Sequence, residues 1–189
     1  MRGLITALVM TTLVGVDAAC EAFTLRTDTS KALVPLEEII SGGPPPDGIP
    51  AIDRPGFVKP AEAAAWVVPK EPVLALEVKG DARAYPLQIL MWHEIVNDVV
   101  GGLPVTVTFC PLCNSGIVFE RVVDGATLDF GTSGKLYKSD LVMYDRQTHS
   151  LWAQMEGRAI VGARAGTRLE LLNLLAELER NGTSVIASP

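Results

Sequence analysis

The sequence predicts an α+β fold rich in β-strands: a mostly antiparallel sandwich or barrel-like sheet, with a few short helices and an amphipathic C-terminal helix. Three observations predict this class. Short runs of β-branched and aromatic residues recur at close intervals, separated by Gly, Asp or Ser. Apolar residues follow helical spacing in the stretches 87–96 and 167–181. Hydrophobic residues make up 48% of the chain, which is enough for one packed core.

Length, charge and cysteine content exclude several classes of protein. A chain of 189 residues is too short for two ordinary domains once its ends are discounted. Its 22 acidic and 16 basic residues give a net charge of −6, and no Lys/Arg cluster suits nucleic-acid phosphates. Three cysteines exclude a disulfide-framework miniprotein. After residue 20, no apolar run reaches the roughly 18 residues of a membrane span, so the mature chain should lack one.

Residues 1–22 have the organisation of a secretory signal peptide. One positive charge precedes the uncharged stretch 3–16, and small and acidic residues follow it. We therefore expect cleavage at the end of this segment and a periplasmic or extracellular location. Cys20 would accept a lipid anchor, but Asp17 stands where a lipoprotein signal carries an aliphatic residue. Lipid anchoring is therefore the weaker alternative.

The rest of the chain is expected to form an N-terminal wrap, 23–60, and a single globular domain, 61–189. The wrap is rich in Pro and Gly, and its three consecutive prolines lack amide donors, so it should be extended with one short helix over 33–40. Alternating and β-branched patterns place the strands of the domain at 73–78, 82–85, 105–109, 117–122, 126–130, 141–144, 150–154 and 158–161.

The last part of the chain carries the pattern of a capped helix. Thr167 and Glu170 have the spacing of a capping box, in which each side chain can satisfy a free amide of the first turn. Leucines follow at helical spacing, and Asn181-Gly182 supplies a stop signal. We expect this amphipathic helix to pack against the sheet.

The most informative motif is Cys110-Pro111-Leu112-Cys113. The proline disfavours a helical conformation at Cys110, so Cys110 should close a strand while Cys113 begins a turn. Two cysteines with this spacing can bind one metal ion, form a redox pair or close a static disulfide. The residues alone leave these alternatives open.

A second group of candidate residues lies on the predicted helix 87–96. His93 and Glu94 begin a near-match to the His-Glu-x-x-His motif of zinc peptidases, but Asn97 occupies the second histidine position and an amide is a poor zinc ligand. His93 and Glu94 remain candidate catalytic acid/base groups, and His93 a candidate metal ligand. The alternative is a histidine beside Trp92 that is hydrogen-bonded to backbone.

We expect Cys110, Cys113 and His93 to converge in one pocket. The helix that carries His93 precedes the strand ending at Cys110 by a short Gly-Gly turn, and consecutive elements are usually neighbours in space. Two thiolates and one imidazole favour copper or zinc as the cofactor. The other histidine, His149, sits in a polar turn and is expected to be solvated at the surface.

Six motifs occur together and in order, in the segments 47–53, 84–87, 92–98, 109–113, 139–146 and 150–152. This set resembles the bacterial and archaeal family called domain of unknown function 3179, over roughly residues 45–170. The resemblance points to His93 and Cys110 as the hallmark polar residues and implies no established reaction. Some relatives carry Thr in place of Cys113, which implies a role for Cys110 alone or with a metal. Relatives have Gly in place of Asn114 and continue past the last helix, which implies C-terminal truncation here.

Two classes of function therefore compete, and the sequence does not decide whether the protein is an enzyme. The first is an exported metal- or thiol-dependent enzyme, with Cys110 as ligand or nucleophile and His93 as ligand or acid/base. The second is a non-catalytic binding or structural domain, in which Cys110 and Cys113 form an inert disulfide. The partner would be a small molecule or a protein. The sequence offers no nucleotide-binding glycine loop that would indicate another cofactor.

Overall fold

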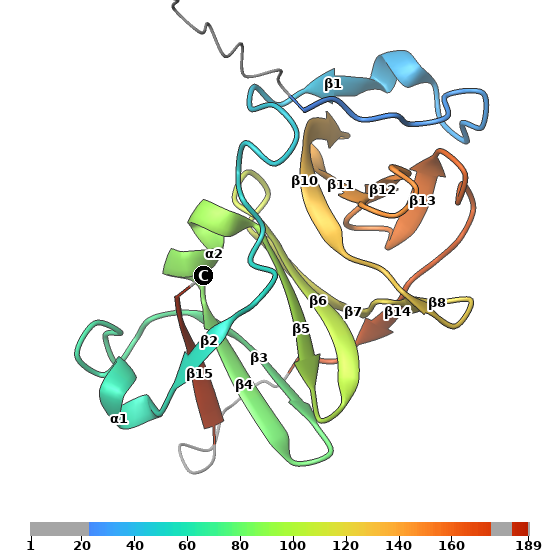
Figure 1. Ribbon diagram of the computed structural model, residues 1–189. Coiled ribbons are helices and arrows are strands. Elements are labelled where there is room, and N and C mark those ends of the chain that lie inside the picture. Colours follow the sequence, from blue (N-terminus) through green and yellow to red (C-terminus); the bar gives the residue numbers. More distant parts are fainter. Residues whose placement is uncertain (1–22, 175–182, 189) are drawn as a thin grey trace, which may run out of the picture.

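The computed structural model describes residues 23–174 and 183–188 and confirms a β-rich, mostly antiparallel α+β fold (Figure 1). The strands form one five-stranded sheet, two four-stranded sheets and a short two-stranded ribbon of β8 (Val122–Val123) and β9 (Ala126–Thr127). The helical elements are the 3₁₀ turn η1 (Leu36–Glu38), α1 (Pro60–Ala63) and α2 (Leu87–His93). Among the described residues, no helix combines the length and apolar character needed to cross a membrane.

The five-stranded sheet is antiparallel throughout. Its order is β1 (Ile39–Ser41), β10 (Phe130–Tyr137), β11 (Asp140–Asp145), β12 (Leu151–Ala153) and β13 (Arg158–Val161). Lys138 and Ser139 connect β10 to β11 with φ angles of 51° and 64°. Two consecutive positive φ values are the turn geometry that matches the twist of paired strands, so this hairpin aligns β11 against β10.

A second sheet, here called the central sheet, lies between the other two in Figure 1. Its order is β14 (Glu170–Leu172), β7 (Ser115–Glu120), β6 (Leu103–Cys110) and β5 (Ile95–Val100). Gly101 and Gly102 join β5 to β6 with φ angles of 56° and 83°. A Cβ at Gly101 would lie 2.1 Å from the carbonyl oxygen of Val78, so this turn requires glycine for space as well as for conformation.

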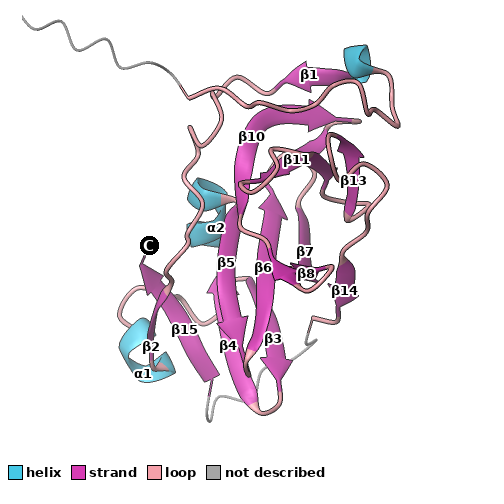
Figure 2. Cartoon of the chain, turned by 45° about the vertical axis from the view of Figure 1, so that its right-hand side comes forward, coloured by secondary structure: helices cyan, strands magenta, loops and turns pink. Residues whose placement is uncertain are grey.

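The third sheet, here called the β15 sheet, joins segments from distant parts of the chain (Figure 2). Its order is β2 (Gly56–Val58), β15 (Thr183–Ser188), β4 (Asp81–Pro86) and β3 (Val73–Val78). Lys79 and Gly80 form the tight turn between β3 and β4, as the sequence predicts. β15 pairs antiparallel with β2 and parallel with β4.

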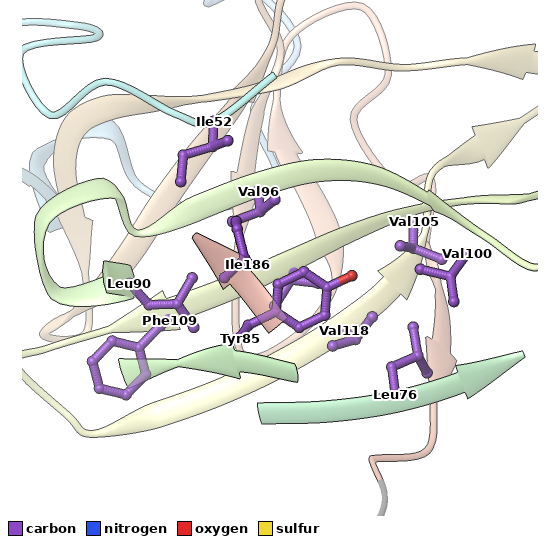
Figure 3. Close-up of a cluster of buried hydrophobic side chains, with 11 residues drawn as sticks. Ile52, Leu76, Tyr85, Leu90, Val96, Val100, Val105, Phe109, Val118 and Ile186 are labelled. Carbon is purple, nitrogen blue, oxygen red and sulfur yellow. The ribbon is translucent and has the colours of Figure 1, made fainter. Parts of the chain in front are cut away.

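Two apolar clusters hold the sheets together. The first fills the space between the central sheet and the β15 sheet, around Tyr85, Phe109 and Ile186 (Figure 3). The second packs the central sheet against the five-stranded sheet, and its members include Cys110, Phe119 and Trp152. Cys110 thus lies where two sheets meet, with its side chain directed into a core.

The expected helix from Thr167 is wrong for the residues that the structure describes. Glu170–Leu172 is instead the edge strand β14, in which Leu171 lies opposite Phe119 of β7. Pairing with the edge of β7 satisfies the backbone hydrogen-bonding groups of this segment. This pairing overrides the capping pattern, because a local capping pattern is only a weak preference for a helix. The rest of that helix, 175–182, and the expected signal peptide, 1–22, lie outside the described residues. The expected helix over 33–40 is reduced to η1 followed by β1.

Candidate functional site

The two cysteines flank the turn between β6 and β7. Cys110 is the last residue of β6 and pairs with Ser115, the first residue of β7, which confirms that Cys110 closes a strand. Cys113 lies within the turn, and Asn114 completes it with φ 52°. Asn tolerates this left-handed conformation better than most residues with a Cβ.

Both thiols are free in the structure, so the inert disulfide of the alternative interpretation is not present. Cys110 is 2% exposed, whereas Cys113 is exposed to solvent. The Sγ atom of Cys113 lies 3.2 Å from Oδ1 of Asp140 and 3.0 Å from Oγ of Ser115. One ligand atom from each of Cys110, Cys113 and Asp140 lies within 4.8 Å of the other two. We call these three residues the thiol–carboxylate cluster.

Asp140 brings a buried carboxylate to this cluster. It is the first residue of β11 and is 5% exposed. Its Oδ2 atom accepts the backbone N–H of Met155 at 2.9 Å. Among the described residues, no Lys or Arg forms an ion pair with it. Because an ionised carboxylate is costly to bury, buried ones are normally paired with a cation or coordinate a metal.

Gln154 fixes the position of the β6–β7 turn. This side chain is fully buried, and its Oε1 accepts the hydroxyl of Ser115 at 2.9 Å. Its Nε2 donates to Oγ1 of Thr108 at 2.9 Å and to the carbonyl oxygen of Ser115 at 3.2 Å. Two of these hydrogen bonds hold Ser115 and the third anchors the amide to Thr108, so the side chain beside Cys113 is kept in one arrangement.

The electrostatics of the cluster favour the protonated thiol at Cys110. Burial raises the pKa of Cys110 to about 12, and its hydrogen bond with the thiol of Cys113 acts in the same direction. A thiol with that pKa is not a thiolate at neutral pH, and the thiolate is the nucleophilic form. By itself, therefore, Cys110 is a poor nucleophile.

The structure does not bring His93 into the cluster. His93 ends α2, and its Nδ1 lies 2.8 Å from the carbonyl oxygen of Pro50. The next residue, Glu94, has φ 57°, and its backbone carbonyl oxygen accepts the N–H of Phe109 at 2.8 Å, so the end of α2 does lie beside the end of β6. Burial raises the pKa of Glu94 to about 7. The helix that carries His93 thus lies near the strand that ends at Cys110, as expected, but the third potential ligand beside the two cysteines is Asp140 rather than His93.

Two further residues differ from the sequence-based expectation. His149 is 9% exposed, so its expected solvated position is wrong; its Nδ1 accepts the backbone N–H of Arg26 at 3.0 Å. Asp140 was not among the candidate residues, although it lies within the segment 139–146 that carries one of the six motifs. In the sequence, Asp140 is distinguished only by being an acidic residue between a turn residue, Ser139, and the start of a predicted strand.

A cavity of about 530 Å³ lies beside the cluster, between β7 and the segment that contains β14. Its walls are largely apolar, with Phe119 and Leu171 among them. Gly116, which follows Ser115, and Met155, whose N–H binds Asp140, also line it. One residue of the cavity wall, Met155, therefore contacts the thiol–carboxylate cluster directly.

The fold and the site together define a β-rich domain with a free dithiol and a buried carboxylate at the junction of two sheets. The family described as "Protein of unknown function (DUF3179)" matches residues 46–178. The chain belongs to this family, as the resemblance in the sequence predicts. Comparisons with curated proteins and with solved structures found no match.

Proposed function

We propose that Cys110, Cys113 and Asp140 bind one zinc ion and leave one coordination position open. The observation that carries this proposal is the approach of three potential ligand atoms to within 4.8 Å of one another. In a tetrahedral site with Zn–S bonds of about 2.3 Å and Zn–O bonds of about 2.0–2.2 Å, ligand atoms lie roughly 3.5–3.8 Å apart. Small side-chain movements would close the cluster around an ion.

The donor set favours zinc over copper(I). Two thiolates suit both ions, but copper(I) selects soft ligands, whereas zinc also accepts a carboxylate oxygen. A bound cation would compensate the buried charge of Asp140. It would also replace the thiol protons of Cys110 and Cys113, because only thiolates bind the metal.

Three protein ligands and an open fourth position are the arrangement of catalytic rather than structural zinc sites. Cys113 is exposed, so water and small molecules have access to that position. The neighbouring cavity of about 530 Å³ provides room for an apolar group of a bound molecule. We propose that zinc acts here as a Lewis acid on a small-molecule substrate of an exported protein.

A second candidate function is thiol–disulfide exchange, which the two free, neighbouring thiols favour. The thiols of Cys110 and Cys113 would form one disulfide and pass two electrons and two protons to a disulfide substrate, which becomes a dithiol. The raised pKa of Cys110 makes it the slower attacking thiol, so the exposed Cys113 would attack first.

Zinc competition against a chromophoric chelator, together with a thiol count, tests the two candidates. Protein purified under reducing conditions is expected to bind one zinc ion per chain, with loss of two titratable thiols. Cys113→Ser and Asp140→Asn should each weaken zinc binding by at least about tenfold. Asp124→Asn, a change at an exposed aspartate outside the cluster, is the matched control and should leave affinity unchanged.

The outcomes separate the candidates. Zinc binding that Asp140→Asn leaves unchanged would contradict the proposed ligand set. Absence of zinc binding, combined with rapid formation of a Cys110–Cys113 disulfide in the presence of oxidised glutathione, would favour thiol–disulfide exchange. Full reactivity of both thiols after zinc addition would exclude them as ligands.

A further inference from the structure

A second cavity of about 530 Å³ lies apart from the thiol–carboxylate cluster, where the N-terminal segment crosses the five-stranded sheet. Besides Pro50 and Ala51, its lining consists of three aromatic rings and a small charged network. The rings belong to Phe23, Tyr144 and His149, and the network consists of Asp47, Asp53 and Arg146. None of these residues takes part in the proposed zinc site.

The three rings form one continuous aromatic wall. The ring centroids of Phe23 and Tyr144 are 6.1 Å apart, those of Phe23 and His149 are 5.7 Å apart, and those of Tyr144 and His149 are 5.9 Å apart. Nδ1 of His149 accepts a backbone N–H, so this nitrogen carries no proton and the imidazole is neutral in this arrangement. The wall therefore contributes aromatic surface without a positive charge.

The charged network has an excess of negative charge. Arg146 bridges the two carboxylates, with Nη2 3.4 Å from Oδ1 of Asp47 and Nη1 in contact with Oδ2 of Asp53. The hydroxyl of Tyr144 donates to Oδ2 of Asp47 at 2.5 Å, and Asn97 donates to Oδ1 of Asp53 at 2.8 Å. One guanidinium opposes two carboxylates, so the cavity carries about one net negative charge.

This balance decides which ligands the cavity suits. An anion would need a free cationic group, but the guanidinium of Arg146 is engaged by both Asp47 and Asp53. A metal ion would have to displace that guanidinium. An organic cation can instead lie against the aromatic faces while it contacts the partly exposed outer lone pairs of the carboxylates.

We propose that this cavity binds a small organic cation, such as a primary amine or a quaternary ammonium compound. The aromatic wall attracts the cation through its ring quadrupoles, and the net charge of Asp47, Asp53 and Arg146 adds a longer-range attraction. The proposal is independent of zinc binding, because it uses neither cysteine nor Asp140.

Choline and its neutral isostere 3,3-dimethyl-1-butanol provide a matched pair of probes, which differ in the charge of the head group. Titration of the full chain by NMR or calorimetry is expected to show one choline site and binding of the isostere that is at least about tenfold weaker. Added salt should weaken the binding of choline more than that of the isostere.

Two variants locate the site. Phe23→Leu removes one ring of the wall, leaves the charged network intact and should weaken choline binding several-fold. Asp53→Asn removes the excess negative charge and should weaken it by about tenfold. Trp92→Leu is the control for Phe23→Leu, since Trp92 is an exposed aromatic residue that does not line the cavity.

The proposal is wrong if intact protein binds no choline, or binds the isostere equally well, since the cavity would then have no preference for a cation. Displacement of choline by acetate from this site would indicate an anion site instead. Should Asp53→Asn fail to fold, as judged by circular dichroism, Phe23→Leu decides: unchanged choline binding by that variant would overturn the proposal.

Discussion

The Sγ atom of Cys113 lies 3.2 Å from Oδ1 of Asp140, although the two residues are 27 positions apart in the chain. The contact joins the β6–β7 turn of the central sheet to the first residue of β11 in the five-stranded sheet. A metal bound across this junction would add a further link between two sheets that already meet through apolar packing and a few buried hydrogen bonds. Zinc should therefore stabilise the fold as well as occupy a site.

Zinc is expected to raise the free energy of unfolding of the wild-type protein by about 2.7 kcal/mol when its free concentration is 100 times Kd. Asp140→Asn should lose most of this gain. Without zinc the variant should be at least as stable as wild type, because it removes an unpaired buried charge while its amide oxygen can still accept the N–H of Met155. Denaturant titration with and without zinc measures both effects, and an equal gain in the two proteins would contradict the ligand assignment.

His93→Ala separates a structural role from a ligand role. The bond between Nδ1 of His93 and the carbonyl oxygen of Pro50 should contribute about 1 kcal/mol, so the variant is expected to be destabilised by that amount. Its zinc affinity should stay within about twofold of the wild-type value. A loss of tenfold or more in that affinity, measured by the same chelator competition, would restore His93 as a ligand.

The raised pKa of Glu94 predicts a pH-dependent gain in stability for Glu94→Gln. In the folded protein this carboxyl keeps its proton up to about pH 7, whereas in the unfolded chain it ionises near its ordinary value of 4.5. Rising pH therefore penalises the folded wild-type protein across this interval. Glu94→Gln should raise the melting temperature at about pH 8 and change it little at about pH 4. Glu77→Gln, at an exposed position, controls for the change in net charge. If Glu94→Gln raised the melting temperature equally at both pH values, the raised pKa of Glu94 would not be the cause.

Tyr85→Phe tests a buried polar pair in the first apolar cluster. The hydroxyl of Tyr85 donates to Oδ2 of Asp98 at 2.7 Å, and both residues are buried. Removing the hydroxyl leaves that carboxylate oxygen without its donor and should cost about 1–3 kcal/mol. A double-mutant cycle with Asp98→Asn, followed by urea denaturation, isolates the pair. Strict additivity of the two changes would show that the bond contributes nothing to stability.

Export remains a prediction from the sequence. Protein recovered from the native host is expected to begin between Ala18 and Phe23, because a signal peptidase cleaves after small residues that follow an apolar stretch. N-terminal sequencing or intact mass measures the start directly. A chain that retains Met1 would show that the segment is not removed.

Local signals in the sequence predicted the local features of the fold well. Pro111 correctly placed Cys110 at a strand end, and Lys79-Gly80 correctly marked a tight turn. The helix expected from Thr167 failed because pairing with β7 outweighs a cap. Asp140 was missed because its contact with Cys113 depends on how two sheets pack. The sequence around either residue contains no pattern that indicates this contact. His149 was misplaced for the same reason, since the distant segment around Arg26 covers it.

The position of β15 has a consequence for how the protein is made. This strand follows all its neighbours in the chain, yet it lies between β2 and β4, so a ribosome delivers it after them. Until then β4 presents an unpaired edge, and β2 has no neighbour in the sheet. Contacts between such distant segments form slowly, and unpaired edges promote association between chains. Co-translational folding should therefore stop short of this sheet, and nascent chains should depend on chaperones until synthesis reaches β15.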